Sequence, residues 1–467
     1  MHSQGIAFRN EEQSNDHRRA IQDLEPRSLR TFTPTLAVLD RSAGSYHWTA
    51  EGRQLYDYTS GVLVANLGHN PRAWLERLFH HLGWDNAPLA GTSNAETTSE
   101  ELLPFVSARP LTAYNATTPL ESETCRRLLA NLHSSPGSQR LEQILWAASG
   151  SEAIQKALWA ALHHNLEKDI ILATRHGFHG KKGLAGACTG SEESPNRDPR
   201  VQFITFPTDE SLDVTNRTQP FDPGPYQKEL ESLKQKHGSR LCCLITEPYL
   251  GGAGSFHPPA EYLQLLQSFC RENKMSFILD EVQSNFGRTG AMYAFETYGL
   301  EPDIVVLGKG MGNGAPVAAA VGSAAILGSM EYGEASDTYS ANPLCCAAVL
   351  ATLEVFESTD IIGHARRVSA ILEEHLLDLK HLKWVEHVRG EGMVWGVQLS
   401  DFQDRSSSEV ANACVRACYL GDADGRAIHL MGPLAGNVLR ISPPLTISET
   451  DARESLDVFR KILSDLW

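Results

Sequence analysis

The stretch FILDEVQSNFGRTG, residues 277–290, begins with a short apolar run that stops on two carboxylates, Asp280 and Glu281. An apolar run of this length without glycine or proline is typical of a strand buried inside a sheet. A charge at the end of a buried strand is costly unless it has a partner. The stretch therefore predicts a core strand whose last residue, Asp280, meets a counter-ion. Glu281 is expected to turn toward backbone donors of the following loop.

Similar apolar runs recur along the central part of the chain. They are QILWAA (143–148), DIILAT (169–174), VQFITF (201–206), LCCLIT (241–246) and DIVVLG (303–308). Helix-like segments separate several of these runs, for example residues 151–164 and 260–274. Alternation of strands and helices is typical of a parallel, doubly wound sheet that is buried on both faces. We expect an α/β fold with a large, mostly parallel sheet domain at residues 71–345.

Different patterns flank this central part. Residues 1–30 are polar and charged and are interpreted as a mobile arm. Residues 37–58 alternate between apolar and polar and favour a small antiparallel sheet with a turn at Gly44 or Gly52. We expect residues 31–70 to join a smaller α+β domain formed by residues 346–467.

The C-terminal part predicts two helices, two strands and a final amphipathic helix. The helices lie at residues 344–357 and 362–379, and the strands at 393–400 and 437–444. The serine run at residues 406–408 is interpreted as a loop.

Composition excludes several classes of function. The formal net charge is −16 and no basic stripe is visible, which argues against a nucleic-acid partner. No apolar run reaches membrane-spanning length. The nine cysteines lack CxxC spacing and are typical of reduced thiols, so we expect a soluble cytoplasmic protein. Adjacent histidine pairs on helices do not face one another, and no metal site is expected.

Polar residues follow the predicted strands at the edge where a parallel sheet binds ligands. Gly150 and Ser151 follow the first run and begin a helix, whose free N–H groups suit a phosphate. An ordinary N-cap explains the same residues. Lys309 follows DIVVLG among glycines, where a lysine can be desolvated and form a Schiff base. A surface lysine in a flexible loop is the alternative.

Asp280 and Phe178 complete this set. A carboxylate at the base of a pocket pairs with a protonated pyridine nitrogen and keeps the ring electron-withdrawing. The alternative for Asp280 is a structural ion pair with Arg288 in the same loop. Phe178 stacks on a flat ring or is simply part of the core. Taken together, these strand-end residues predict a site for pyridoxal 5′-phosphate.

Eight ordered motifs carry a resemblance that covers the chain from about residue 34 to its end. They are TSGVLVANLGHNP, SGSEAIQKAL, HGFHGKKGLAGACTG, ITEPYLGGAG, FILDEVQSNFGRTG, PDIVVLGKGMGNGAPVAA, TYSANPLCCAAVLATLEV and NVLRISPPLTI. On these motifs the sequence resembles the class-III pyridoxal-phosphate aminotransferases, the ornithine/GABA/ω-amino-acid group. The resemblance implies the fold-type-I transferase architecture and ping-pong transfer of an amino group from an amine or amino acid to a keto acid.

The resemblance also implies a role for individual residues. Lys309 holds the cofactor as a Schiff base and moves the proton, and Asp280 faces the ring nitrogen. The expected cofactor contacts are Gly150, Ser151, Phe178, His179, Glu247, Val282 and Gln283, together with Thr338 from the neighbouring subunit of a homodimer with shared active sites. His179 and Glu247 are expected to act through other groups. The expected substrate contacts are Arg440, Val62 and Lys181, with Arg440 receiving a carboxylate by a bidentate contact.

Two departures from the family pattern concern the substrate. Family members that use 2-oxoglutarate commonly carry a glutamate that masks the arginine, where this chain has Gly252. Many carry an arginine where this chain has Lys181, and lysine lacks the fork that grips a carboxylate. We expect a preference for a small keto acid such as pyruvate over 2-oxoglutarate.

Two other functions remain open at this stage. The same fold and cofactor support racemases, epimerases and decarboxylases of amino acids, and the sequence does not fix which bond at the α-carbon breaks. A regulatory or binding protein that kept the fold without turnover is the other alternative. The set of Lys309, Asp280, Gln283, Thr338 and Arg440 favours an enzyme over this second alternative.

Overall fold

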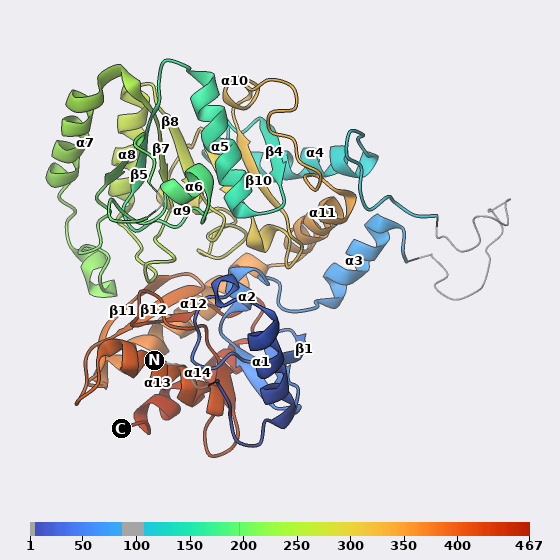
Figure 1. Ribbon diagram of the computed structural model, residues 1–467, viewed down its shortest axis with the longest axis vertical. Helices are drawn as coiled ribbons and strands as arrows, with labels where there is room; N and C mark the ends of the chain where they lie inside the picture. The colour runs from blue at the N-terminus through green and yellow to red at the C-terminus, as the bar shows by residue number, and fades with distance from the viewer. Residues whose placement is uncertain (1–4, 86–106, 196) are drawn as a thin grey trace.

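A computed structural model describes residues 5–85, 107–195 and 197–467 of the protein. The larger domain lies in the upper half of Figure 1 and is built on a seven-stranded sheet of order β4-β10-β9-β8-β7-β5-β6. Its strands are β4 (Gln143–Ala147), β5 (Ile170–Thr174), β6 (Val201–Ile204), β7 (Leu241–Thr246), β8 (Ser276–Asp280), β9 (Ile304–Leu307) and β10 (Ala318–Gly322).

All six strands predicted for the central sheet are confirmed. The seventh strand, β10, was not predicted, and it runs antiparallel to both of its neighbours, β4 and β9. Its sequence is AAAVG, in which Val321 is the one bulky residue, and it follows a glycine-rich loop. β10 therefore gives no strong strand signal of its own, and pairing on both edges holds it in the sheet.

The sheet is buried on both faces because its strands place alternate residues in two separate cores. Ile278 of β8 packs with the α5 and α6 side of the sheet, whereas Phe277 and Leu279 pack into the larger core on the opposite side. Figure 1 shows α5 and α6 in front of the strands.

The helices of this domain fill the connections between strands. They are α3 (Arg72–Leu82), α4 (Pro119–His133), α5 (Gly150–His164), α6 (Gly183–Ala187), α7 (Gly224–His237), α8 (Ala260–Glu272), α9 (Ala294–Tyr298) and α10 (Ala324–Leu327). Helix α11 (Pro343–Ser358) packs against α3 and α4, so the expected boundary at residues 345 and 346 falls inside a helix of the larger domain.

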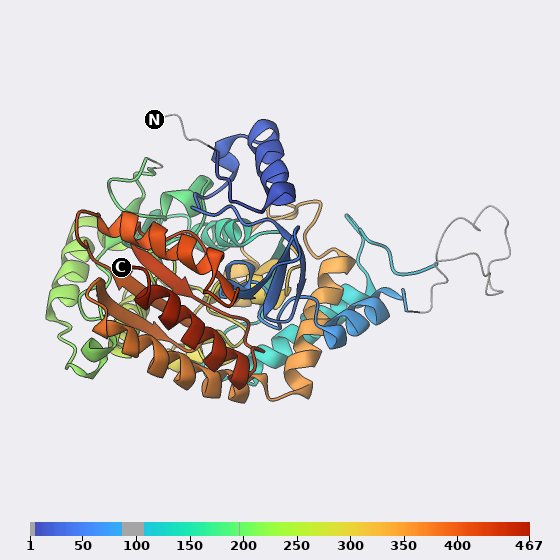
Figure 2. The same cartoon turned by 90° about the horizontal axis from the view of Figure 1, so that it is seen from below.

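The small domain combines chain segments from both ends of the sequence. Strand β3 pairs in parallel with β13, which places the N-terminal segment beside the C-terminal one, as Figures 1 and 2 show. Its elements are β1 (Leu39–Ala43), β2 (Tyr46–Thr49), β3 (Gln54–Asp57), α2 (Ser60–Leu63), α12 (Ile361–Asp378), β11 (Val385–Glu391), β12 (Val394–Leu399), α13 (Ser407–Leu420), β13 (Ala427–His429), β14 (Val438–Ile441) and α14 (Glu449–Ser464). Short 3-10 helices lie at Arg27–Leu29, Val214–Thr218, Gly238–Arg240, Lys309–Met311 and Leu379–His381.

The N-terminal residues differ from the expected mobile arm. Helix α1 (Glu12–Leu24) packs on the small domain, and its buried Arg18 donates to Glu11 at 2.8 Å and to the Tyr419 hydroxyl at 2.9 Å. The charged residues of this segment suggested an arm in solvent, but one of them, Arg18, is buried and hydrogen-bonded to buried partners. Residues 1–4 of the expected arm lie outside the described residues.

The serine run was interpreted wrongly as a loop. Ser406 caps α13 by accepting from the Glu409 amide, while the Glu409 carboxylate accepts from the Ser406 amide at 2.9 Å. Ser407 and Ser408 lie in the first turn of the helix. The spacing of serine and glutamate is the capping-box signal, and it was present in the sequence.

Among the helices of the described residues, none combines the length and the apolar character that crossing a bilayer requires.

Candidate active site

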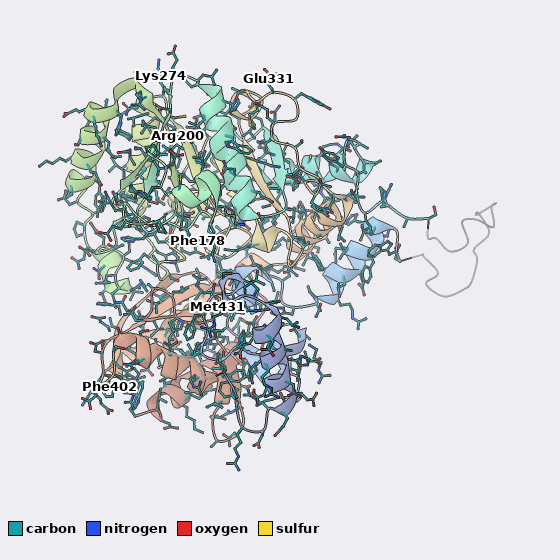
Figure 3. The ribbon with its side chains drawn as sticks, in the orientation of Figure 1. Phe178, Arg200, Lys274, Glu331, Phe402 and Met431 are labelled. Carbon is teal, nitrogen blue, oxygen red and sulfur yellow. The ribbon has the colours of Figure 1, made fainter. Side chains whose placement is uncertain are left out.

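The functional side chains gather where the carboxyl ends of the central strands meet the small domain. Asp280 is the last residue of β8, Glu247 follows β7, and Lys309 follows β9. Phe178, on the loop after β5, lies at the boundary between the two domains in Figure 3. Because parallel strands end at one edge of the sheet, residues distant in sequence share this place.

Asp280 is held by two donors from its own domain. It is 5% exposed, its Oδ1 accepts from the Val282 amide at 3.0 Å, and its Oδ2 lies 2.7 Å from His179 Nδ1. The other ring nitrogen of His179, Nε2, is buried and has no hydrogen-bond partner in residues 5–85, 107–195 and 197–467. His179 was expected to act through another group, and its contact with Asp280 is consistent with that role. Each carboxylate oxygen keeps a lone pair for a further donor.

Arg288 is not the partner of Asp280. It is fully buried and donates to the carbonyl oxygens of Met393 and Pro443 and to Asn66 Oδ1, at 3.0, 2.8 and 2.6 Å. Burial lowers the pKa of Arg288 to about 10. This arginine fastens the loop after β8 to the small domain, and the proposed ion pair with Asp280 is wrong.

Glu281 turns away from Asp280, as expected. Its Oε2 and Oε1 accept from the Ala294 and Phe295 amides at 2.6 and 2.7 Å, at the N-terminus of α9. Burial raises the pKa of Glu281 to about 8, although the two amides oppose the shift. The two adjacent carboxylates therefore have different surroundings, and only Asp280 faces the strand-end site.

Lys309 is half-buried in a strained turn. It begins the 3-10 helix Lys309–Met311 with a φ of 47°, a conformation that costs energy in residues other than glycine. Burial lowers the pKa of Lys309 to about 8, and the nearby Arg440 charge acts in the same direction. A β-carbon on the next residue, Gly310, would overlap the Asn66 side chain. The N-terminal segment thus packs directly on the lysine turn.

The N-terminus of α5 is capped by a serine and lies close to the loop after β8. Ser149 is the N-cap, with its hydroxyl 3.3 Å from the Glu152 amide, so Gly150 and Ser151 are the first residues of the helix. A β-carbon on Gly150 would lie 2.9 Å from Val282 Cγ1. Glycine at this position therefore allows the helix end to approach the loop after β8.

Glu247 links the loop after β5 to the loop after β7. Its Oε1 accepts from the Phe178 amide at 2.8 Å and its Oε2 from the Gly251 amide at 3.3 Å. Burial raises the pKa of Glu247 to about 7. The Phe178 ring is 48% exposed, and the backbone of Gly252 lies against it, since a β-carbon there would be 3.2 Å from Phe178 Cβ. Gln283 Oε1 lies beside Gly251 and is buried, with no hydrogen-bond partner among the residues that the structure describes.

Arg440 reaches the site from β14 of the small domain. Its Nη2 donates to the Gly251 carbonyl at 2.6 Å, and its buried Nε has no hydrogen-bond partner within the described part of the chain. Burial lowers the pKa of Arg440. A guanidinium with an unsatisfied donor beside Lys309 is suited to a carboxylate ligand.

Three predicted residues are not part of this buried cluster. Val62 is 44% exposed on α2, Lys181 is exposed on the loop before α6, and Thr338 is exposed on the loop between α10 and α11. Helix α2 is a left-handed turn, with φ of 47° at Ser60 and 69° at Val62. Its Ser60 hydroxyl donates to the Ser442 carbonyl at 2.7 Å.

Sequence reasoning missed residues that support the site from other segments. Asn66 lies against the lysine turn, and Tyr249 is fully buried near Arg440, whose charge acts on its hydroxyl. Both residues lie within the motifs that carry the family resemblance. Their position next to assigned residues is the sequence signal that could have identified them.

Comparison with known families and proteins identifies the chain. Residues 106–463 match the family model described as "Aminotransferase class-III". Acetylornithine aminotransferase of Methanothermobacter thermautotrophicus is 28% identical over 94% of this chain and 96% of its own length. The 4-aminobutyrate aminotransferase of Mycobacterium bovis is 31% identical over 64% of this chain and 68% of its own length.

Solved structures share the fold over nearly the whole chain. Ornithine aminotransferase of Toxoplasma gondii has a TM-score of 0.77 at 20% identity and covers 98% of this chain and 96% of its own. An amine transaminase from an uncultivated Pseudomonas species, solved with pyridoxal phosphate bound, has a TM-score of 0.72 at 24% identity and covers 94% and 95%. The family match covers well over half of the chain. It identifies the reaction as amino-group transfer and not as racemisation, epimerisation or decarboxylation. The chain belongs to the class-III aminotransferases and is a pyridoxal-phosphate-dependent enzyme that transfers amino groups.

Proposed function

We propose that the enzyme transfers an amino group from an amine or amino acid to a small 2-keto acid such as pyruvate. The observation that carries this choice of acceptor is the buried Arg440. Its Nε has no hydrogen-bond partner among the described residues, and its Nη2 donates to the carbonyl of Gly251, next to a glycine at position 252. No side chain at that position supplies a carboxylate to mask the guanidinium. A small keto acid such as pyruvate has one carboxylate, and Arg440 binds it.

The strand-end residues fit pyridoxal phosphate. Lys309 offers an amine that burial brings close to neutrality, Asp280 has free lone pairs, and Gln283 Oε1 is a buried acceptor without a partner. When bound, the cofactor supplies an aldehyde that joins an amino group and a ring that withdraws electrons from the attached carbon. The chemistry of these three groups matches the amine, ring-nitrogen and ring-oxygen positions that such a molecule needs.

In this proposal each side chain has one task. The Lys309 amine attaches the cofactor and then carries the proton to and from the substrate α-carbon. The Asp280 carboxylate keeps the ring nitrogen protonated, and His179 fixes the orientation of that carboxylate. The amides and hydroxyl at the start of α5 bind the phosphate. Phe178 and Val282 cover the two faces of the ring, while Lys181 and Val62 border the substrate.

We also propose that two copies of the chain form the working enzyme. Thr338 lies on an exposed loop whose neighbours Tyr332 and Tyr339 are 107% and 67% exposed. Exposed aromatic side chains grouped on one loop are typical of a surface that a protein partner covers. Thr338 then reaches the phosphate of the neighbouring copy. The nine unpaired cysteines, eight of them buried, support a reducing, cytoplasmic location as part of the same proposal.

The choice of acceptor is tested with a panel of keto acids and with Gly252→Glu. A β-carbon at position 252 needs only a small shift of Phe178, so the new side chain fits. Its carboxylate pairs with Arg440, and we expect the KM for pyruvate to rise at least about fivefold, the equivalent of about 1 kcal/mol. Gly252→Gln has the same size without the charge and is expected to change this KM much less. Faster turnover of the unmodified enzyme with 2-oxoglutarate than with pyruvate would contradict the proposal.

Thr338→Val tests the shared site. Loss of one hydrogen bond to a charged phosphate is expected to weaken cofactor binding by about tenfold or more, as measured by titrating the apoenzyme with pyridoxal phosphate. Ser336→Ala changes the same loop, where the Ser336 hydroxyl bonds only the Gly333 carbonyl among the described residues, and is expected to bind normally. Sedimentation is expected to show dimers for all three proteins. A monomeric, fully active enzyme would disprove the shared site.

A further inference from the structure

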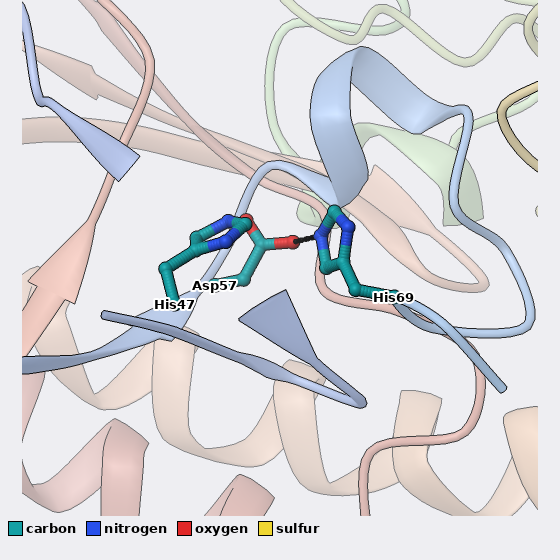
Figure 4. Close-up of side chains that lie close together, drawn as sticks. All are labelled: His47, Asp57 and His69. Carbon is teal, nitrogen blue, oxygen red and sulfur yellow. Dashed lines mark hydrogen bonds and ion pairs between the residues drawn. The ribbon is translucent and has the colours of Figure 1, made fainter. Parts of the chain in front are cut away.

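Two histidines and an aspartate meet in the small domain, outside the strand-end site. His47 comes from β2, Asp57 ends β3, and His69 lies on the loop before α3. Figure 4 shows their side chains pointing toward one another. One ligand atom from each, a ring nitrogen or a carboxylate oxygen, lies within 4.8 Å of the other two.

Asp57 lies at the centre of this group and is fully buried. Its Oδ1 accepts from the Thr59 amide and the Thr59 hydroxyl, both at 2.7 Å, which fixes the plane of the carboxylate. Its Oδ2 lies 2.8 Å from His69 Nε2. The buried carboxylate therefore lies between the two imidazole rings.

His47 has one ring nitrogen fixed and the other free. Its Nδ1 lies 2.7 Å from Ser42 Oγ, whereas its Nε2 lies 3.3 Å from Asp57 Oδ1 without forming a hydrogen bond. His47 is 2% exposed, so water does not replace the missing partner from the surface. An unpartnered, buried nitrogen aimed at a carboxylate is costly unless something lies between them.

A third imidazole, that of His429, lies beside His47. The His429 ring lies edge-on to His47 at 5.4 Å between centroids, and its Nδ1 is also buried without a partner. A network of ion pairs accounts for the contacts of Asp57 with His69 and His47, at 2.8 and 3.3 Å. It leaves the His429 Nδ1 without a hydrogen-bond partner among the described residues.

The geometry resembles that of a transition-metal site. Zinc prefers histidine nitrogen and carboxylate oxygen, and bonds of about 2.0–2.1 Å put tetrahedral ligands about 3.3–3.4 Å apart. The 3.3 Å between His47 Nε2 and Asp57 Oδ1 matches this value. The 2.8 Å between His69 Nε2 and Asp57 Oδ2 is a hydrogen-bond distance, which an ion would lengthen by about 0.5 Å. Ser42 on His47 and Thr59 on Asp57 provide the outer hydrogen bonds that orient metal ligands. His69 is 18% exposed in its side chain and gives the ion a route from solvent.

We propose that His47, Asp57 and His69 bind one divalent transition-metal ion of the zinc type. The ion fixes Asp57, and Asp57 holds Thr59, the residue that caps the left-handed turn α2. The site therefore anchors the segment that carries Val62 to the boundary between the domains. This inference does not depend on the amino acceptor or on the identity of the donor.

The test uses the pyridoxal-phosphate-loaded enzyme, cleared of metal with a chelator and titrated with Co²⁺ as a coloured substitute for Zn²⁺. We expect one Co²⁺ per chain, with the visible absorption of a tetrahedral ion, and displacement of Co²⁺ by added Zn²⁺. His47→Gln and His69→Gln are each expected to weaken binding at least about tenfold, because loss of an outer ligand contact alone has that effect. His80→Gln removes an exposed histidine on α3 and is expected to bind as the unmodified enzyme does.

Each outcome decides the proposal. Stoichiometric Co²⁺ binding that both cluster variants weaken and His80→Gln preserves supports it. Failure of the unmodified enzyme to bind Co²⁺, or equal binding by His47→Gln, overturns it and leaves an ion-pair network. Circular dichroism and the melting temperature of each variant show that the fold is intact. If His47→Gln does not fold, Co²⁺ binding by His69→Gln, which changes the more exposed position, tests the proposal instead.

Discussion

Lys309→Ala is expected to lower kcat by at least about 10⁴-fold with any amino donor, because it removes both the attachment of the cofactor and the proton carrier. Lys309 is half-buried, and the charges of Asp280 and Glu247 act on its amine. Lys309→Arg is not expected to restore activity, since a guanidinium does not lose its proton at the pH of the reaction. Steady-state kinetics with the cofactor in excess measure the effect.

The control for this substitution is Lys274→Ala, which removes an exposed lysine far from the site, as Figure 3 shows. Its kcat is expected to stay unchanged. Equal melting temperatures of the two variants exclude unfolding as the cause. A Lys309→Ala enzyme that retains a tenth of the original kcat would show that another group performs the chemistry.

The half-buried position of Lys309 also predicts how the apoenzyme loads its cofactor at different pH values. The neutral amine is the nucleophile, and its pKa is lowered to about 8. The rate of covalent attachment is therefore expected to rise with pH and to level off above about 8, whereas an exposed lysine would show the rise near its ordinary value of about 10.4. Stopped-flow absorbance at a series of pH values measures this rate. A rate that continues to rise far above pH 8 would place the lysine in water.

Asp280→Asn is expected to lower kcat about 10²–10³-fold, the usual effect of removing one electrostatic partner from a reacting group. The amide keeps the size of the side chain but loses the charge that holds the ring nitrogen protonated. The KM for the donor is expected to change less than kcat, because the substrate carboxylate binds Arg440.

The neighbouring residue provides a matched control for Asp280. Glu281 is buried at the adjacent position, yet its two oxygens accept from the Ala294 and Phe295 amides and do not face the strand-end site. Glu281→Gln keeps the size of the side chain but turns one of these acceptors into a donor, so the melting temperature is expected to fall while kcat of the folded variant stays within about twofold. Equal losses in the two variants would mean that the loop, and not the Asp280 charge, supports catalysis.

Local signals predicted much of the fold. The six parallel strands are bulky apolar runs with clear ends, and the helices between them follow the period of an amphipathic helix. The same approach failed for β10, whose small residues acquire strand structure only from neighbours on both sides. It also failed for α1, because the charge of Arg18 suggested solvent whereas its partners lie on α13 and just before α1.

The sequence by itself determined which chemical groups lie at the strand ends, because parallel strands place their carboxyl ends on one edge and the residues after each strand can be read directly. Only the tertiary structure decided how those groups are paired. Asp280 contacts His179 and not Arg288, Arg440 of the small domain contacts Gly251 of the large one, and His47 meets Asp57 and His69. Hydrogen bonds and metal coordination depend on distances of a few ångströms between segments far apart in the chain, and such distances exist only after the domains have packed.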